Sequence, residues 1–242
     1  MKIIAIIPAR FSSTRFPGKP LVSIKGKPMV QHVYERAINS NLFQKVIVAT
    51  DDERIQAKVL DFGGEVVMTD INHQSGTDRC GEVIKCLNES FDVVINIQGD
   101  EPFIQEEQLE ELVSLFRNTQ AQIGTLKKEI TNAEDVFDSN IVKVIAGLER
   151  RALYFSRSAM PFVRDVKRED WLGKQKFYKH IGLYGYRSEV LKDLIKLKPS
   201  VLELSESLEQ LRWLENGYQI FIAETNYESI GIDTPEDLSR IV

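Results

Sequence analysis

The sequence predicts an α/β protein in which a Rossmann-like, mainly parallel sheet has helices on both faces. Apolar, β-rich runs alternate with helical patterns along the first half of the chain, which is typical of strand–helix–strand units. Several of these runs are too continuously apolar for strands with one solvent-exposed face. Polar motifs directly follow the runs, at the strand ends where such sheets bind ligands. We expect the 242 residues to form one domain, 1–242, with an inserted arm at about 122–190.

The first half is expected to supply the parallel part of the sheet. Buried strands are predicted at 2–8, 45–50, 64–69 and 93–98. Helical patterns are predicted at 29–39, 52–62, 77–87 and 106–117. Gly63 and Gly64 provide a stop for the second of these helices before the short third strand.

The second half has a different pattern and is expected to contain the arm. It is predicted to hold a strand pair at 141–146 and 152–157, an exposed irregular loop at 165–176, a strand at 179–187, helices at 188–197 and 205–216, and a late strand at 219–224. A last helix is expected to open at Thr234, because a cap residue is followed there by Pro235 and Glu236.

Composition and charge exclude several classes of protein. A net charge of −5 argues against a nucleic-acid-binding face. No apolar run approaches the ~18 residues that a membrane helix needs, and the N-terminus lacks the features of a signal peptide. Cys80 and Cys86 would lie on nearly opposed faces of a helix, so we interpret them as reduced thiols of a cytoplasmic protein.

The loop IPARFSSTRFPGKP at 7–20 follows the first predicted strand and is interpreted as a phosphate-binding loop. It contains Arg10, Arg15 and Lys19, and Ser13 is one of the hydroxyl residues between them. Arginine can bind phosphate through two parallel hydrogen bonds, and lysine binds it as a point charge. The loop is not a Walker A motif. The alternative interpretation is a solvated basic loop.

Two aspartates follow short apolar runs and are candidate metal ligands. Asp100 lies in NIQGDEP at 96–102, and Asp233 lies in GIDTPEDL at 231–238. Mg²⁺ is commonly bound by one or two carboxylates together with phosphate oxygens. Each aspartate could instead be an ordinary turn or helix-capping residue.

The motif HQSGTDR at 73–79 is a polar turn that leads into a predicted helix. Gln74, Ser75 and Arg79 could bind an anion or a base carbonyl at the helix N-terminus. The alternative is simple capping by Thr77, with Asp78 in the first turn.

The second half offers groups that suit a polyhydroxylated acid. Arg157 stands at a strand end, His180 and Tyr184 share one face of a strand, and Glu209 and Gln210 come early in a helix. Arginine could bind the carboxylate, and the other groups could bind hydroxyls. Each also has a structural interpretation; a lone histidine in a strand, for example, is often a hydrogen-bonding residue of the core.

Taken in order, these motifs resemble the 3-deoxy-manno-octulosonate cytidylyltransferases, also called CMP-Kdo synthetases. The resemblance covers nearly the whole chain; it includes LYFSRSAMP, HIGLYGYR and LEQLRWLE from the second half. It implies a nucleotidyltransferase fold of the GT-A-like type and transfer of CMP from CTP to the anomeric hydroxyl of Kdo, with release of pyrophosphate, in lipopolysaccharide biosynthesis. It also implies a homodimer with part of the arm at the interface.

The resemblance further implies a role for each candidate residue. Arg10, Arg15 and Lys19 would hold the triphosphate, and Lys19 would stabilise the departing pyrophosphate. Ser75 and Arg79 would lie at the cytidine, and Asp100 and Asp233 would bind catalytic Mg²⁺. The Kdo site would be lined by Gln98, Arg157, His180, Tyr184, Glu209 and Gln210.

Three alternatives to this function are weighed. Glu101 follows Asp100 where the relatives that use the 8-amino form of Kdo carry glutamine, which favours plain Kdo over 8-amino-Kdo. An enzyme using a nucleotide-sugar donor would commonly show a D-x-D motif, which is absent after this strand. A non-catalytic nucleotide-binding regulator would have no need for both aspartates.

Overall fold

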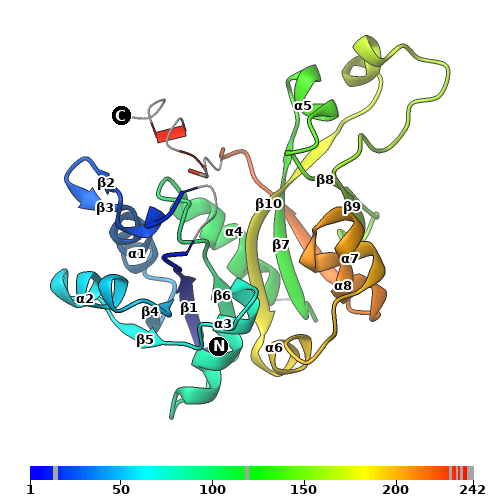
Figure 1. Ribbon diagram of the computed structural model, residues 1–242. Helices are drawn as coiled ribbons and strands as arrows, with labels where there is room; N and C mark the ends of the chain where they lie inside the picture. The colour runs from blue at the N-terminus through cyan, green and yellow to red at the C-terminus, as the bar shows by residue number, and fades with distance from the viewer. Residues whose placement is uncertain (13–15, 118–119, 229–230, 233, 235–236, 239–242) are drawn as a thin grey trace.

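The computed structural model describes residues 1–12, 16–117, 120–228, 231–232, 234 and 237–238. In this part of the chain a nine-stranded sheet is the central element (Figure 1). Its strands run in the order β11-β7-β10-β6-β1-β4-β5, and β8 and β9 extend it beside β10. The predicted α/β class is thus confirmed.

The parallel half of the sheet is formed by four strands from the first hundred residues: β1 (Ile3–Pro8), β4 (Lys45–Thr50), β5 (Val66–Met68) and β6 (Val93–Asn96). They pair in parallel, with β1 between β4 and β6. All four were predicted, and β5 and β6 are shorter than expected.

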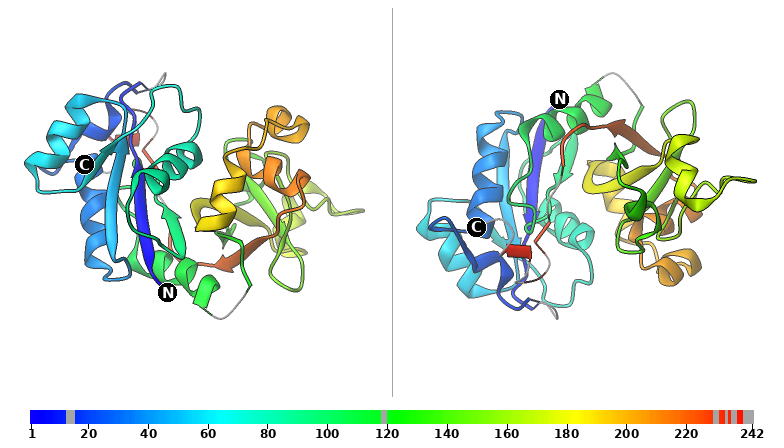
Figure 2. Two further views of the ribbon diagram at one scale, coloured as in Figure 1. Left: turned by 90° about the horizontal axis from the view of Figure 1, so that it is seen from below. Right: turned by 90° about the horizontal axis from the view of Figure 1, so that it is seen from above.

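Helices cover both faces of this half because successive side chains of β1 point to opposite sides. Ala5 and Ile7 pack with α1 (Met29–Asn39), α2 (Glu53–Asp61) and α4 (Glu106–Arg117). Ile4 and Ile6 face α3 (Gly76–Cys86), α6 (Ser188–Leu194) and α8 (Glu209–Glu215). The views from below and above show these helices on either side of the strands (Figure 2).

The other half of the sheet is mixed, because β10 (Tyr178–Arg187) runs antiparallel to both β6 and β7. β7 (Ile123–Glu129) was not predicted; its second half is charged, and its only apolar run is interrupted by Gly124. β11 (Ile220–Glu224) pairs in parallel with β7 and forms the edge. The charged half of β7 is accommodated through ion pairs such as that of Lys127 Nζ with Glu224 Oε2, at 3.2 Å.

The segment between β7 and β10 lies within the expected arm at about 122–190 and projects from the rest of the molecule (Figure 1). It contains α5 (Ala133–Phe137), β8 (Lys143–Ala146), β9 (Ala152–Ser156) and the 3-10 helix η2 (Arg168–Gly173). The predicted exposed loop at 165–176 is wrong in part. Trp171 within it is buried and stacks on Phe177, because the arm has a small core of its own.

Two further expectations are corrected. The helix predicted at 205–216 is divided into α7 (Val201–Glu206) and α8, because Ser207 between them has a left-handed backbone with φ of 53°. A short hairpin, β2 (Ser23–Ile24) and β3 (Lys27–Pro28), was also missed. Cys80 is buried and Cys86 exposed, and both are free thiols, as predicted. None of the helices in the described residues is long and apolar enough to cross a membrane.

Candidate active site

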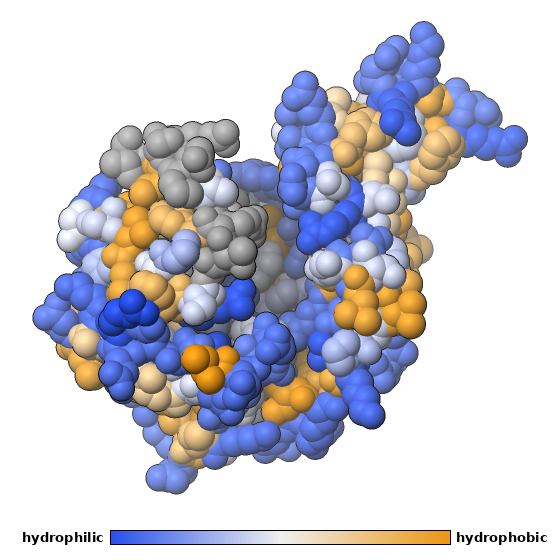
Figure 3. Space-filling view, in the orientation of Figure 1, coloured by the Kyte–Doolittle hydropathy of each residue, from blue (hydrophilic) through white to orange (hydrophobic). Residues whose placement is uncertain are grey.

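A cleft of about 220 Å³ lies at the carboxyl ends of β1 and β6, where the fold class predicts a ligand. Its lining residues come from three loops that follow strands: Pro8, Ala9, Arg10, Lys19, Pro20, His73, Gln74, Ser75, Gly76, Arg79, Gln98, Gly99 and Asp100. Seven predicted site residues are therefore brought together here. In the space-filling view, the coloured residues along the right side of the central hollow are mainly hydrophilic (Figure 3).

One wall of the cleft carries a lysine and a carboxylate in direct contact. Lys19 begins the 3-10 helix η1 (Lys19–Leu21), directly after Gly18, whose φ of 72° suits glycine. Lys19 Nζ lies 2.6 Å from Asp100 Oδ2, although 81 residues separate them. Asp100 also accepts a hydrogen bond on its backbone oxygen from the backbone N–H of Ile232, at 3.0 Å.

Three predicted residues, Ser13, Arg15 and Asp233, lie outside the described residues. Ile232 is the residue that precedes Asp233 in the sequence, and it is buried in a small cluster with Ile24 and Met29. The described C-terminal segment is therefore anchored beside Asp100.

The floor of the cleft needs a glycine after Gln98. A Cβ on Gly99 would come within 2.7 Å of the backbone oxygen of Pro8, a contact that real Cβ atoms essentially never make. The close approach keeps the loops after β1 and β6 together. Gln98 itself is only weakly held, with Nε2 3.4 Å from Asn96 Oδ1.

The opposite wall is the turn before α3. Ser75, and not Thr77, is the cap of this helix; its side chain accepts from the backbone N–H of Asp78, whose carboxylate accepts from the N–H of Ser75. This reciprocal pair leaves Gln74 and Gly76 on the cleft. Gln74 Nε2 donates to the backbone oxygen of Asn72 at 2.8 Å.

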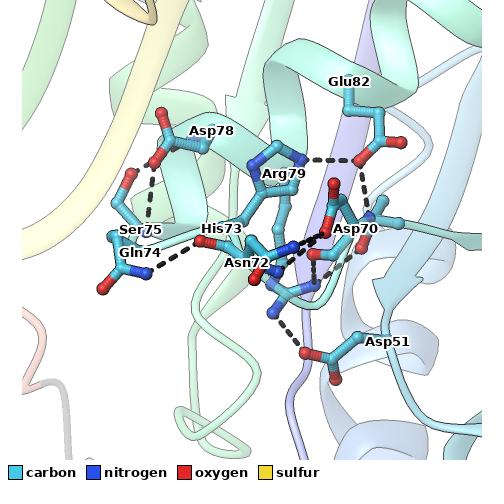
Figure 4. A network of polar contacts seen from close by, with 10 residues as sticks. Asp51, Asp70, Asn72, His73, Gln74, Ser75, Asp78, Arg79 and Glu82 are labelled. Atoms are coloured by element: carbon cyan, nitrogen blue, oxygen red, sulfur yellow. Dashed lines mark hydrogen bonds and ion pairs between the residues drawn. The ribbon is translucent and has the colours of Figure 1, made fainter.

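Arg79 is held in a buried network behind this turn (Figure 4). Its Nη2 pairs with Asp51 Oδ2 at 2.5 Å, and its Nη1 donates to Thr69 Oγ1 at 2.7 Å and to the backbone oxygen of Asp70 at 3.3 Å. The side chains of Arg79 and Asp51 are only 4% and 11% exposed. The guanidinium thus fixes the turn from behind while it lines the cleft. The sequence analysis missed Asp51, although it follows the strand at 45–50.

The same turn is tied to α3 at a second point. His73 Nε2 lies 2.6 Å from Glu82 Oε2, which also accepts from the backbone N–H of Asp70 at 2.9 Å. The Asp51–Arg79 pair and the His73–Glu82 contact therefore hold both sides of the segment that presents Gln74 and Ser75 (Figure 4).

A second group of predicted residues lies in the mixed half of the sheet. The His180 ring packs edge-on against Phe155, with ring centroids 5.0 Å apart, and at 5.3 Å from the ring of Tyr184. Its Nε2 is 2.9 Å from Thr125 Oγ1. Burial lowers the pKa of His180 to about 3, so the ring is neutral at physiological pH.

Tyr184 presents a hydroxyl that is unusual for a buried side chain. The residue is 8% exposed, and its hydroxyl has no well-formed hydrogen bond to a described residue. Burial raises the pKa of Tyr184 well above its usual value, although the Thr125 side chain lies close enough to oppose this rise. Buried hydroxyls are normally satisfied, so this group is available to a ligand.

Glu209 and Gln210 begin α8, and the structure connects them with the cleft. Glu209 Oε2 accepts from Thr77 Oγ1 at 2.8 Å, and Thr77 follows the cleft residue Gly76. Burial raises the pKa of Glu209, while its hydrogen bond to Thr77 opposes this. Tyr184 is connected through the sheet, because it pairs with Asn96 at the end of β6.

Arg157 is the member of this group that backbone oxygens hold most firmly. It directly follows β9; its Nε donates to the backbone oxygen of Glu206 at 2.7 Å, and its Nη1 donates to that of Ser139 at 3.0 Å. None of the five residues of this group lines the 220 Å³ cleft. His180 and Tyr184 lie in β10, Glu209 and Gln210 lie in α8, and Arg157 follows β9.

Comparison with known proteins places this chain among cytidylyltransferases. A cytidylyltransferase family model matches residues 4–224. The 3-deoxy-manno-octulosonate cytidylyltransferases of Phocaeicola vulgatus and Parabacteroides distasonis are 54% and 52% identical, each covering 99% of this chain and 96% of its own length.

Solved structures show the same likeness. A CMP:2-keto-3-deoxy-manno-octonic acid synthetase in complex with CTP superposes with a TM-score of 0.92 at 41% identity, covering 100% of this chain and 97% of its own. A Leptospira borgpetersenii cytidylyltransferase, 17% identical with a TM-score of 0.64, shares the fold. The strand-end cleft, its Lys19–Asp100 pair and the full-length similarity together show that this chain belongs to the 3-deoxy-manno-octulosonate cytidylyltransferase family.

Proposed function

We propose that this chain transfers CMP from CTP to the anomeric hydroxyl of Kdo, giving CMP-Kdo and pyrophosphate for lipopolysaccharide biosynthesis. The observation that carries the proposal is the contact between Lys19 and Asp100 at the strand-end cleft, where a cation for phosphate and a carboxylate for a metal stand 2.6 Å apart. Its relatives are named 3-deoxy-manno-octulosonate cytidylyltransferases, which favours plain Kdo over 8-amino-Kdo as the sugar substrate.

Within this proposal, Asp100 and Asp233 hold Mg²⁺. Asp100 fits the role because its carboxylate is 34% exposed in the cleft, and magnesium needs few protein ligands when phosphates supply the others. When bound, the ion supplies charge neutralisation and a lowered pKa of the attacking hydroxyl.

Different residues of the chain bind the triphosphate, the nucleotide and the sugar acid in this proposal. Arg10 and Lys19, with Arg15 and Ser13, bind the triphosphate, and Lys19 stabilises negative charge on the departing pyrophosphate. Gln74, Ser75 and Arg79 shape the nucleotide side of the cleft. Neutral His180 and the Tyr184 hydroxyl suit hydroxyl groups of the sugar acid, and Arg157 suits its carboxylate. Gln98, Glu209 and Gln210 complete the sugar side.

Two finer statements belong to the same proposal. We propose a homodimer with part of the arm at its interface, supported by exposed Phe162 on the arm, which is 75% exposed. We also propose a cytoplasmic location, supported by the free thiols of Cys80 and Cys86.

The function is tested by pyrophosphate release from the purified protein with CTP, Mg²⁺ and Kdo, omitting each in turn. Release that requires all three is expected. Pyrophosphate release with 8-amino-Kdo but not with Kdo would show that 8-amino-Kdo is the substrate and would leave the proposed mechanism unchanged. Folded protein that binds CTP but releases nothing with either sugar would contradict the proposal.

A further inference from the structure

A buried lysine in the arm has no part in the site described so far. Lys143, in β8, is 0% exposed. Its Nζ donates to the backbone oxygens of Asp138 at 2.7 Å and Ile141 at 2.5 Å. Burial lowers the pKa of Lys143, which the nearby Asp138 carboxylate partly offsets. An ammonium group is costly to bury, so its retention here requires a reason.

The two carbonyls belong to one tight turn between α5 and β8. Within it the backbone N–H of Ile141 donates to the Asp138 oxygen at 3.2 Å, and that of Asn140 donates to Asp138 Oδ1 at 2.8 Å. Lys143 Nζ joins the first and last residues of this turn from the protein interior. The lysine therefore fixes the position of segment 138–142 relative to β8.

The same segment supports two residues of the proposed sugar site. The backbone oxygen of Ser139, inside the turn, accepts from Arg157 Nη1 at 3.0 Å. The oxygen of Val142 accepts from the backbone N–H of His180 at 2.8 Å. The Arg157 guanidinium is thus held between Ser139 and Glu206, and a displaced turn would release one of these two supports.

We propose that Lys143 is a positioning residue that, by fixing the turn at 138–142, sets the orientation of Arg157 toward the carboxylate of the sugar acid. The inference rests on the proposed function, in which Arg157 binds that carboxylate. Lys143 itself has no contact with the substrate in this scheme. Loss of Lys143 should therefore weaken binding of the sugar acid and leave binding of CTP unchanged.

The test compares Lys143→Met, Arg157→Ala and the double variant in steady-state kinetics with CTP, Mg²⁺ and Kdo. We expect Lys143→Met to raise the KM for Kdo roughly tenfold, while the KM for CTP stays within about twofold. In the double variant the two effects should not add, because both changes remove the same contact. Lys196→Met, at an exposed lysine paired with Asp193, is the matched control and should behave as the parent.

The outcomes separate the inference from the function on which it rests. If Arg157→Ala leaves the KM for Kdo unchanged, the assigned role of Arg157 fails and the inference fails with it. If Arg157→Ala raises that KM but Lys143→Met does not, or the two effects multiply, the inference alone is overturned. If Lys143→Met does not fold, Asp138→Ala loosens the same turn from its exposed side. It must raise the KM for Kdo without changing that for CTP, or the inference is rejected.

Discussion

The parallel half and the mixed half of the molecule hold their candidate site residues in different ways. In the parallel half, Lys19, Gln74 and Asp100 stand in loops directly after strands, and they keep solvent contact in a cleft. In the mixed half, His180 and Tyr184 project from the middle of β10 and are surrounded by rings. The cleft therefore presents charged groups, whereas in the mixed half burial keeps the His180 ring neutral and raises the pKa of Tyr184 well above its usual value.

This difference has a physical reason. A triphosphate carries a large charge, which accessible cations and a metal can neutralise without a desolvation penalty on the protein. A sugar acid is recognised largely through hydroxyl groups, which fixed neutral donors and acceptors can distinguish. Four substitutions test this contrast.

Asp100→Asn should have the largest effect, and this effect should be on turnover and not on CTP binding. We expect kcat to fall at least about a hundredfold, because the variant loses a charged metal ligand and the partner of Lys19. CTP binding, measured by calorimetry, should remain detectable. Asp193→Asn, at an exposed ion pair, serves as the control. Near-parental turnover in Asp100→Asn would rule out the metal role.

Asp51→Ala should lower the stability of the parallel half of the molecule. It leaves Arg79 buried without its carboxylate, which should lower the free energy of unfolding by about 3 kcal/mol. The turn carrying Gln74 should loosen as well, so the KM for CTP should rise more than that for Kdo. Denaturant unfolding and kinetics check both effects. Unchanged stability would show that the pair contributes little.

His180→Asn should alter how the stability of the protein depends on pH. Folding lowers the pKa of His180 from 6.5 to about 3, so the unfolded chain takes up a proton that the folded chain refuses. His180 therefore makes stability rise with pH between about 3 and 6.5, and its contribution is lost as the pH falls through that range. The variant should have a slope smaller by up to about 1.4 kcal/mol per pH unit there. An identical slope in both proteins would contradict the neutral assignment.

Tyr184→Phe should have the smallest effect on the fold and a selective effect on the sugar. The hydroxyl has no well-formed hydrogen bond to a described residue, so its removal should leave the melting temperature unchanged or slightly raised. The KM for Kdo should rise severalfold while that for CTP stays constant. A clear loss of stability would mean that the hydroxyl has a structural partner instead.

Sequence patterns were sufficient for the parallel half. The bounds of α1, α4 and β4 agree with prediction, because continuous apolar runs and 3.6-residue periodicity are local signals. The same patterns failed at β7, whose charged half is a strand only because β10 and β11 flank it. They failed again at Trp171, whose burial depends on Ile130 and Val136, which are distant in the sequence, as well as on nearby Phe177.

The candidate residues could be predicted from the sequence, but the contacts that hold them in place could not. The Asp51–Arg79 pair and the Thr77–Glu209 bond join positions 28 and 132 residues apart. Nothing in a residue's own neighbourhood indicates such partners. A better signal would have been Asp51 itself, which occupies the same strand-end position as the aspartates that were singled out.

The amino-acid sequence by itself determined the fold class, the strand-end loops and the family, because these depend on local periodicity and on motifs that are contiguous in the chain. The contacts of Lys19 with Asp100 and of Arg79 with Asp51 form only when the chain folds. The same is true of the hydrogen bonds from Arg157 to two backbone oxygens. Burial likewise decided the charge of His180. Contacts, pKa values and the orientation of a side chain are set by groups brought together through folding, and those groups are far apart in the sequence.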